Sequence, residues 1–110
     1  MYVSITGLRL NNPLHFLRFM RHAIPSFKQA QAADGNLFCE TKTIDGVHHT
    51  LTIWESKKAM KAYVASGAHL KAMKVFQSMA TGSVYSYETE TQPSWEEALK
   101  CWHADARPVG

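Results

Sequence analysis

Alternation of apolar and polar residues, with enrichment in Val, Ile, Thr and Tyr, predicts four β-strands. The four segments are residues 2–10, 36–44, 47–55 and 83–91. Asp45-Gly46 joins the second and third of these segments, and this dipeptide favours the two-residue turn of a β-hairpin. The pattern therefore predicts four strands, of which the middle two form a hairpin.

Between the first and second strands, apolar residues recur every three or four positions, which predicts a helix with those residues on one side. They are Leu14, Leu17, Met20, Ile24 and Phe27. Asn12 is a suitable N-cap before Pro13, and Asp34-Gly35 is a suitable end. Pro25 lies inside the pattern, and because it cannot bond to the Arg21 carbonyl, we expect a kink or a break there.

A second helical pattern runs from Lys57 to about residue 65, with Ser56 as its cap, and Ser66-Gly67 interrupts it. A further helical piece then carries mostly apolar residues as far as Gly82. Near the end of the chain, Ser94-x-x-Glu97 is a capping box. It predicts a C-terminal helix with Trp95, Leu99 and Trp102 on one side.

The order strand, helix, strand, strand, helix, strand predicts an α+β fold. We expect one ferredoxin-like βαββαβ domain over residues 1–110, with an antiparallel four-stranded sheet and an extra C-terminal helix. Two helices cover one face of such a sheet, and nothing covers the other unless the C-terminal helix wraps round it. Because threonines recur at alternate positions of the strands, that face could be polar and exposed to solvent. However, Tyr2, Trp54, Tyr85 and Tyr87 indicate apolar surface on both faces, so a second copy is the economical cover and we expect a homodimer.

Composition narrows the class of protein. The chain has 110 residues, and 12 Lys+Arg against 9 Asp+Glu give a net charge of +3, too mild to call for nucleic acid. Cys39 and Cys101 are the only cysteines, which excludes a disulfide scaffold. No apolar stretch is long enough to cross a bilayer, and the N-terminus is unlike a signal peptide. We therefore expect a cytoplasmic protein with no membrane partner.

The segment Leu51-Thr52-Ile53-Trp54-Glu55-Ser56, followed by a small residue and the aromatic Tyr63, resembles a known superfamily. It is similar to the dimeric α+β barrel proteins, in particular those related to antibiotic-biosynthesis monooxygenases. The resemblance implies two ferredoxin-like subunits whose sheets face each other, each with a small pocket between sheet and helices. It also implies chemistry that varies between members, including oxidation of phenols or quinols without metal or flavin.

The haem-degrading branch of this superfamily fits poorly. Members of that branch use an Asn in the first strand, a Trp in the helix after the Trp-Glu-Ser segment and, further along, a His that binds the iron. The corresponding positions in this chain are about Gly7, Tyr63 and Met73, and the nearest histidine, His69, lies one turn before Met73. These three departures argue against haem, and we expect no bound cofactor.

A cofactor-independent oxidation needs a base, one or two hydrogen-bond donors and apolar walls. His22, His69 and Tyr63 are the candidate catalytic residues. A surface or capping role is the simpler interpretation of His69, and His22 could instead point outward beside Arg18 and Arg21. Trp54, Met73, Phe76 and Phe27 are the candidate substrate-binding residues, and such residues are more often core than cofactor site.

Metal and nucleic-acid sites have little support. His48 and His49 are adjacent on a strand and point to opposite faces, and no other histidine or cysteine spacing is typical of a metal site. No aromatic run typical of an RNA-binding sheet is present. The sequence thus predicts a small monooxygenase-like enzyme acting on an apolar or aromatic molecule. The alternative is a non-catalytic small-molecule binder or structural dimer.

Overall fold

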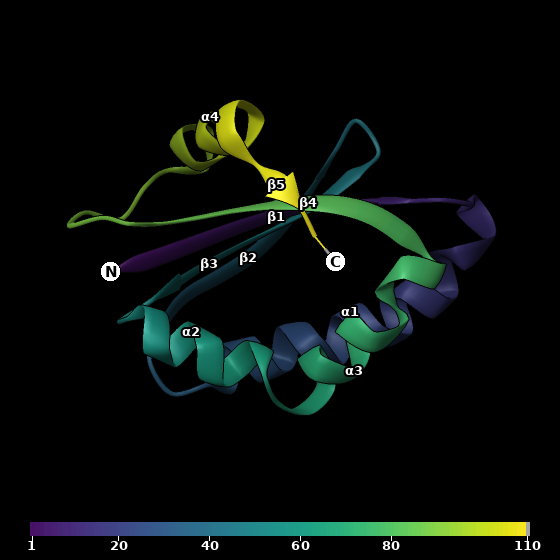
Figure 1. Ribbon diagram of the computed structural model, residues 1–110, viewed down its shortest axis with the longest axis horizontal. Helices are drawn as coiled ribbons and strands as arrows, with labels where there is room; N and C mark the ends of the chain where they lie inside the picture. Colours follow the sequence, from purple (N-terminus) through teal and green to yellow (C-terminus); the bar gives the residue numbers. More distant parts are fainter. Residues whose placement is uncertain (110) are drawn as a thin grey trace.

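Strands distant in the sequence pair in one antiparallel sheet with the order β2-β3-β1-β4-β5. The computed structural model describes residues 1–109 (Figure 1). The strands are β1 Tyr2–Leu10, β2 Asn36–Ile44, β3 Val47–Trp54, β4 Ala80–Glu88 and β5 Arg107–Pro108. The α-helices are α1 Phe16–Ala32, α2 Lys57–Val64, α3 Gly67–Val75 and α4 Trp95–Asp105, and the 3-10 helices are η1 Pro13–His15 and η2 Phe76–Ser78. The predicted α+β class and ferredoxin-like order are confirmed, with the short β5 added at one edge of the sheet.

Local signals act as expected at the hairpin and at the helix ends. Asp45 and Gly46 both adopt positive φ, 51° and 77°, as a tight hairpin turn requires. Ser56 caps α2 through the Ala59 N–H, and Ser94 forms the complete capping box of α4. Gly67 is the first residue of α3 and has φ 61°, in the left-handed region that glycine tolerates, so the chain changes direction there after α2.

The break expected at Pro25 does not occur, because α1 continues through it. Arg21 and Pro25 both lie on the exposed side of the helix. Water can therefore hydrogen-bond the Arg21 carbonyl that Pro25 leaves free, which removes much of the penalty of an internal proline.

The predicted apolar side of this helix is not the side that faces the sheet. Leu14, Leu17 and Ile24 are 87%, 79% and 46% exposed. The buried residues of α1 are instead Phe19, Ser26 and Ala30. Ala30 packs with Tyr2 and Trp54, two large side chains that rise from the sheet. Its small side chain lets α1 approach them closely.

The second face of the sheet is covered by the chain itself. Helices α1, α2 and α3 lie on one side of the sheet, the inner face, and α4 lies on the other, the outer face (Figure 1). On the outer face Val3, Ile5, Leu51 and Ile53 are almost fully buried with Ala98 of α4. Of the alternatives that the sequence left open, the structure therefore has the C-terminal helix over the second face, because Trp95, Leu99 and Trp102 turn α4 into an apolar cover.

A tight contact fixes the position of α4. The indole of Trp102 lies over Gly7, and its Nε1 donates to the Ser83 carbonyl at 3.0 Å. The His49 ring meets the Trp102 ring edge-on, with 4.7 Å between centroids. Any side chain at residue 7 would collide with Trp102, so the glycine is needed for this close approach.

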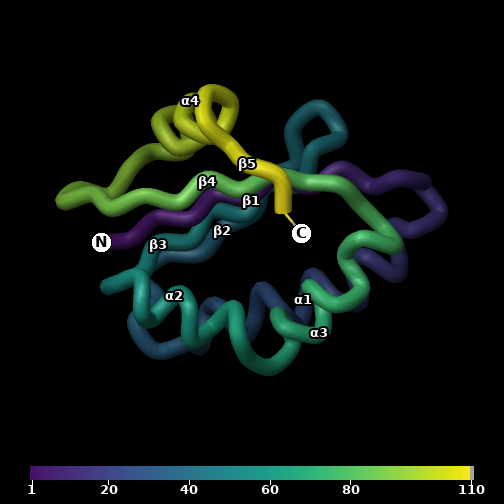
Figure 2. The backbone as a smooth tube through the Cα atoms, in the orientation of Figure 1, coloured from purple at the N-terminus to yellow at the C-terminus, as the bar shows by residue number. Residues whose placement is uncertain are grey.

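Figure 2 shows the same arrangement in the backbone trace, with the helical layer of α1, α2 and α3 along one side of the molecule and α4 on the far side. Within residues 1–109, no helix has both the length and the apolar character needed to cross a membrane.

Candidate functional site

Three aromatic rings form a connected stack between the sheet and the helical layer. Trp54, the last residue of β3, is fully buried and stacks on Tyr63 of α2, with 5.1 Å between ring centroids. The ring of His69 of α3 also contacts the Tyr63 ring, with 4.6 Å between centroids and a tilt of 52°. The structure thus brings together three of the residues that the sequence indicates: Trp54, Tyr63 and His69.

Tyr63 is held by α1 through its hydroxyl group. The hydroxyl donates to the Ser26 carbonyl at 3.1 Å and lies 3.0 Å from Ser26 Oγ, which then donates to it. Burial raises the pKa of Tyr63 to about 12. Tyr63 is therefore a neutral phenol whose single proton is engaged, and its ring contacts the rings of both Trp54 and His69.

His69 is oriented so that one ring nitrogen is free. Its Nδ1 lies 3.2 Å from the Val64 carbonyl, and because a carbonyl can only accept, Nδ1 carries the proton of the neutral ring. Burial lowers the pKa of His69 below its usual value of 6.5. At neutral pH, Nε2 is therefore an unprotonated nitrogen that can accept a proton.

Gln29 of α1 locks this region in place. Its Oε1 accepts from the His69 backbone N–H at 2.9 Å, and its Nε2 donates to the Ser66 and Tyr63 carbonyls at 2.9 and 3.3 Å. The side-chain amide satisfies backbone groups at the junction of α2 and α3, so the start of α3 and His69 are held against α1.

The indole N–H of Trp54 has no hydrogen-bond partner. It is the one buried side-chain polar atom in residues 1–109 that lacks one. An unpaired buried donor costs roughly 1–3 kcal/mol, so native proteins rarely retain one without a use for it. In contrast, the indole groups of Trp95 and Trp102 donate to Glu40 and to the Ser83 carbonyl.

Hydroxyl groups line the centre of the inner sheet face. Ser86 Oγ donates to Ser4 Oγ at 3.1 Å, and Thr52 Oγ1 donates to the Ser4 carbonyl at 3.4 Å. Thr6 and Thr50 lie further along the same face, since side chains alternate along a strand. The Thr-rich sides of the strands therefore face the helices, contrary to the expectation that they could form a wet outer face.

The remaining candidate residues are more scattered. His22 is half-buried and lies on the same side of α1 as Phe19 and Ser26, because it is three residues after one and four before the other. Phe76 is buried in a separate apolar cluster with Phe19, Met79 and Ala80. Phe27 is half-buried, and Met73 is 41% exposed.

No group of His, Cys, Asp or Glu within residues 1–109 is arranged to hold a metal ion. His48 contacts Phe19 beside the helical layer, whereas His49 contacts Trp102 beneath α4. The two adjacent histidines therefore point to opposite faces, as the strand pattern predicts.

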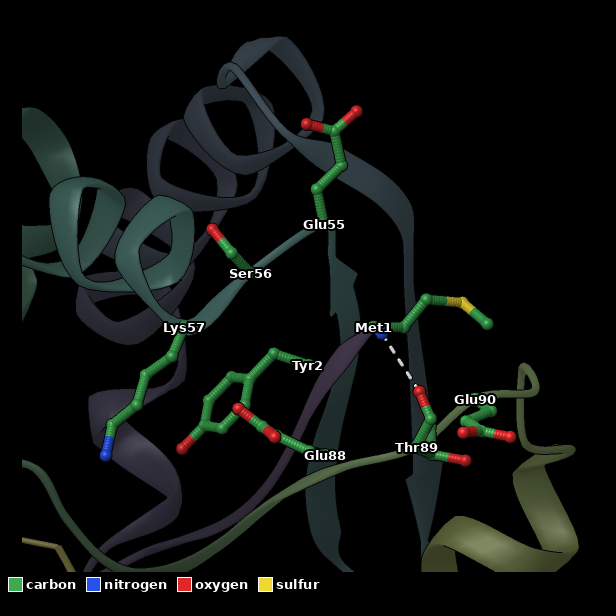
Figure 3. A pocket seen from close by; sticks show the side chains of 8 residues that line it. All are labelled: Met1, Tyr2, Glu55, Ser56, Lys57, Glu88, Thr89 and Glu90. Carbon is green, nitrogen blue, oxygen red and sulfur yellow. Dashed lines mark hydrogen bonds between the residues drawn. The ribbon is translucent and has the colours of Figure 1, made fainter.

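Two hollows open near the ends of the sheet, and neither is lined by Trp54, Tyr63 or His69. The first, of about 370 Å³, lies between the start of β1, the end of β4 and the start of α2 (Figure 3). Glu55 and Lys57 point in different directions in this view, so their charges do not converge on one ligand. The second, of about 420 Å³, lies beside Gly7 and Trp102 on the outer side.

Burial of His69 and His49 makes stability depend on pH. Desolvation lowers the pKa of both groups, so the unfolded chain binds protons more readily than the folded one below about pH 6.5. This contribution is fully present above that pH and is lost as pH falls through the folded pKa values.

We therefore expect the free energy of unfolding in urea to be lower at pH 5 than at pH 7.5. His49→Gln should reduce this difference, and His15→Gln on η1 is the matched control. An identical pH dependence in the His49→Gln variant and the native chain would contradict the assignment.

No protein-family model and no curated protein matches the sequence. Solved structures do resemble the fold. A provisionally assigned antibiotic biosynthesis monooxygenase from Nitrosomonas europaea superposes with a TM-score of 0.73 at 12% identity, covering 83% of this chain and 100% of that chain. Rv0793 from Mycobacterium tuberculosis gives 0.73 at 13%, covering 86% and 100%.

SnoaB, a cofactor-independent oxygenase from Streptomyces nogalater, gives a TM-score of 0.62 at 11% identity, covering 83% of this chain and 94% of that chain. Identities this low show a shared fold and leave the chemistry open. The chain has the ferredoxin-like α+β fold of the antibiotic biosynthesis monooxygenase-like proteins.

Proposed function

We propose that the protein is a cofactor-independent monooxygenase-like enzyme that acts on a small apolar or aromatic molecule between the sheet and the helices. The observation that carries the proposal is the unpaired indole N–H of fully buried Trp54, one ring away from the free Nε2 of His69. A hydrogen-bond donor and a base that contact the same tyrosine ring suit a phenolic substrate, whose oxygen can accept a hydrogen bond and whose hydroxyl can lose a proton.

The residues have distinct roles in this proposal. His69 Nε2 takes the substrate proton, and Trp54 Nε1 donates to the oxygen on which negative charge develops. Tyr63 positions both groups. The electron-rich anion then reacts with dioxygen: one oxygen atom enters the product as a carbonyl, the other leaves as water, and the substrate supplies the hydrogens. Apolar walls from buried Tyr2 and Ala30 and half-buried Met60 limit access of water to the anion.

Oxygen uptake with a panel of phenols and quinols tests this function. Wild-type protein is expected to consume oxygen and form a carbonyl product. Trp54→Phe is expected to lower the rate about tenfold, since one hydrogen bond of about 1.4 kcal/mol to the developing anion is lost. Trp95→Phe, whose indole bonds to Glu40 on the outer side, is the matched control and should keep full activity.

Absence of uptake across the panel would contradict the monooxygenase role. A second candidate is then a non-catalytic binder. It is favoured by the position of the two hollows, neither of which is lined by Trp54, Tyr63 or His69. Binding of a quinol without turnover would identify this case.

The homodimer remains a proposal. Helix α4 covers the centre of the outer face, but Phe38, Tyr85 and Tyr87 beside it are only half-buried, and a second copy could bury them.

Both cysteines are free thiols, which suits the reducing cytoplasm.

Sedimentation velocity at micromolar concentration should therefore show a dimer, and Tyr87→Arg should shift it toward monomer by placing a charge in the contact. Leu17→Ser on the helical layer is the control and should leave the dimer intact. A native monomer would overturn the proposed pairing.

A further inference from the structure

Charge is distributed very unevenly over the two sides of the molecule. Helices α1, α2 and α3 carry eight of the twelve Lys and Arg residues and none of the nine Asp and Glu residues. All eight cations are exposed: Arg18, Arg21, Lys28, Lys57, Lys58, Lys61, Lys71 and Lys74. On the opposite side of the sheet, α4 carries Glu96, Glu97 and Asp105. The small net charge of +3 therefore conceals a strongly cationic helical layer.

The same helical layer exposes large apolar side chains. Leu14 and Leu17 are 87% and 79% exposed, and Ile24, Leu70 and Met73 are 46%, 38% and 41% exposed. Leu17 and Ile24 are seven residues apart, as are Arg21 and Lys28, so apolar and cationic rows run side by side along α1. Both rows lie on the side of α1 opposite the buried residues Phe19, Ser26 and Ala30.

This combination limits the kinds of partner that fit. A nucleic acid would account for the cations but not for leucines that protrude into water. A second copy would bring like charges together, which costs free energy. A protein partner would have to offer a groove shaped to these protruding leucines and lined with acidic groups for the flanking cations. A deformable surface with anionic groups outside and apolar chains beneath them accepts both the protruding leucines and the flanking cations, and it needs no groove.

We propose that the outer surface of α1, α2 and α3 docks on an anionic lipid bilayer. Leu14, Leu17 and Ile24 enter the region between headgroups and acyl chains, and the surrounding Lys and Arg residues contact the lipid phosphates and carboxylates. The expectation of no membrane partner rested on the absence of a spanning segment, and docking on the surface needs none. The proposal is independent of the proposed enzyme activity.

Co-sedimentation of the full chain with vesicles tests the docking. Vesicles of phosphatidylcholine with about one-third phosphatidylserine should bind the protein, and vesicles of phosphatidylcholine alone should bind it at least about tenfold more weakly. High salt should weaken the binding to anionic vesicles, because it screens the charges.

Two pairs of substitutions locate the surface. Arg21→Glu with Lys28→Glu, and separately Leu14→Ser with Leu17→Ser, should each weaken binding about tenfold or more. The control pair Lys100→Glu with Arg107→Glu changes the net charge equally on the α4 side and should have less than about a twofold effect. All of these positions are exposed, so thermal unfolding should remain near that of the native chain.

Three results would overturn the proposal. The first is no binding to anionic vesicles. The second is equal loss in both charge-reversal pairs, which would indicate attraction without a defined surface. The third is full binding by the Leu14→Ser and Leu17→Ser pair together with retention on heparin, which would indicate a polyanion such as a nucleic acid as the partner.

Discussion

Replacing His69 by Gln is expected to lower kcat/KM for oxidation of a phenol by about 10²- to 10⁴-fold, the usual contribution of a positioned general base. Gln retains a donor for the Val64 carbonyl, which His69 contacts at 3.2 Å, but its side chain cannot accept a proton at neutral pH. The fold around Tyr63 should therefore persist while the proton acceptor is lost. Oxygen uptake and product formation measure the effect.

The pH profile separates catalysis from structure in this experiment. In the native protein, kcat/KM for the proposed oxidation should fall as pH drops below the lowered pKa of His69, because protonation removes the base. The residual activity of His69→Gln should lack that limb. His22→Gln is the control on α1; if it costs as much activity as His69→Gln, the assignment of His69 as the base is wrong.

Gly7→Ala is expected to lower the free energy of unfolding by about 3 kcal/mol, at the upper end of the range for overpacking. The new methyl group would lie 2.8 Å from Trp102 Cε2 and 2.9 Å from His49 Cε1, closer than carbon atoms normally approach. Either α4 lifts from the sheet or β1 shifts, and both expose buried apolar surface on the outer face. Urea unfolding measures the change.

A double-mutant cycle with Trp102→Ala identifies the cause. If the clash with Trp102 is responsible, Gly7→Ala should cost much less, by about 2 kcal/mol, in the Trp102→Ala background. Equal costs in both backgrounds would show that α4 does not lie on Gly7 in solution, and would reopen the outer face as a free surface.

Features that a few neighbouring residues determine could be predicted from the sequence. The Asp45-Gly46 turn, the Ser56 and Ser94 caps and the break before Gly67 each depend on local backbone conformation and local hydrogen bonds. The order of these elements then limits the topology to a ferredoxin-like sheet.

Features that depend on packing could not. Helix α1 carries two sets of apolar residues, one with Leu17 and Ile24 and the other with Phe19 and Ala30. Periodicity alone does not say which set faces the sheet. The set with Ala30 does so, because Trp54 and Tyr2 fill the space between Ala30 and the sheet. The docking of α4 similarly depends on the absence of a side chain at Gly7, which gives no signal before Trp102 is placed.

The candidate site was predicted in part. Residue types and the family resemblance point to Trp54, Tyr63 and His69, and the structure places the three in contact. Sequence reasoning missed Ser26 and Gln29, since a polar residue on a helix looks like a solvent contact until its partner is known. It also could not reveal that Trp54 alone among the three tryptophans has an unpaired indole N–H.

That indole group offers the most direct test of the proposed binding site. In an anaerobic NMR titration with a quinol, the Trp54 indole N–H resonance, assigned by its loss in Trp54→Phe, should shift saturably as it gains an acceptor. The indole resonances of Trp95 and Trp102, which already donate to Glu40 and to the Ser83 carbonyl, should stay in place. A stationary Trp54 resonance, or equal shifts of all three, would contradict a substrate held between the sheet and the helices.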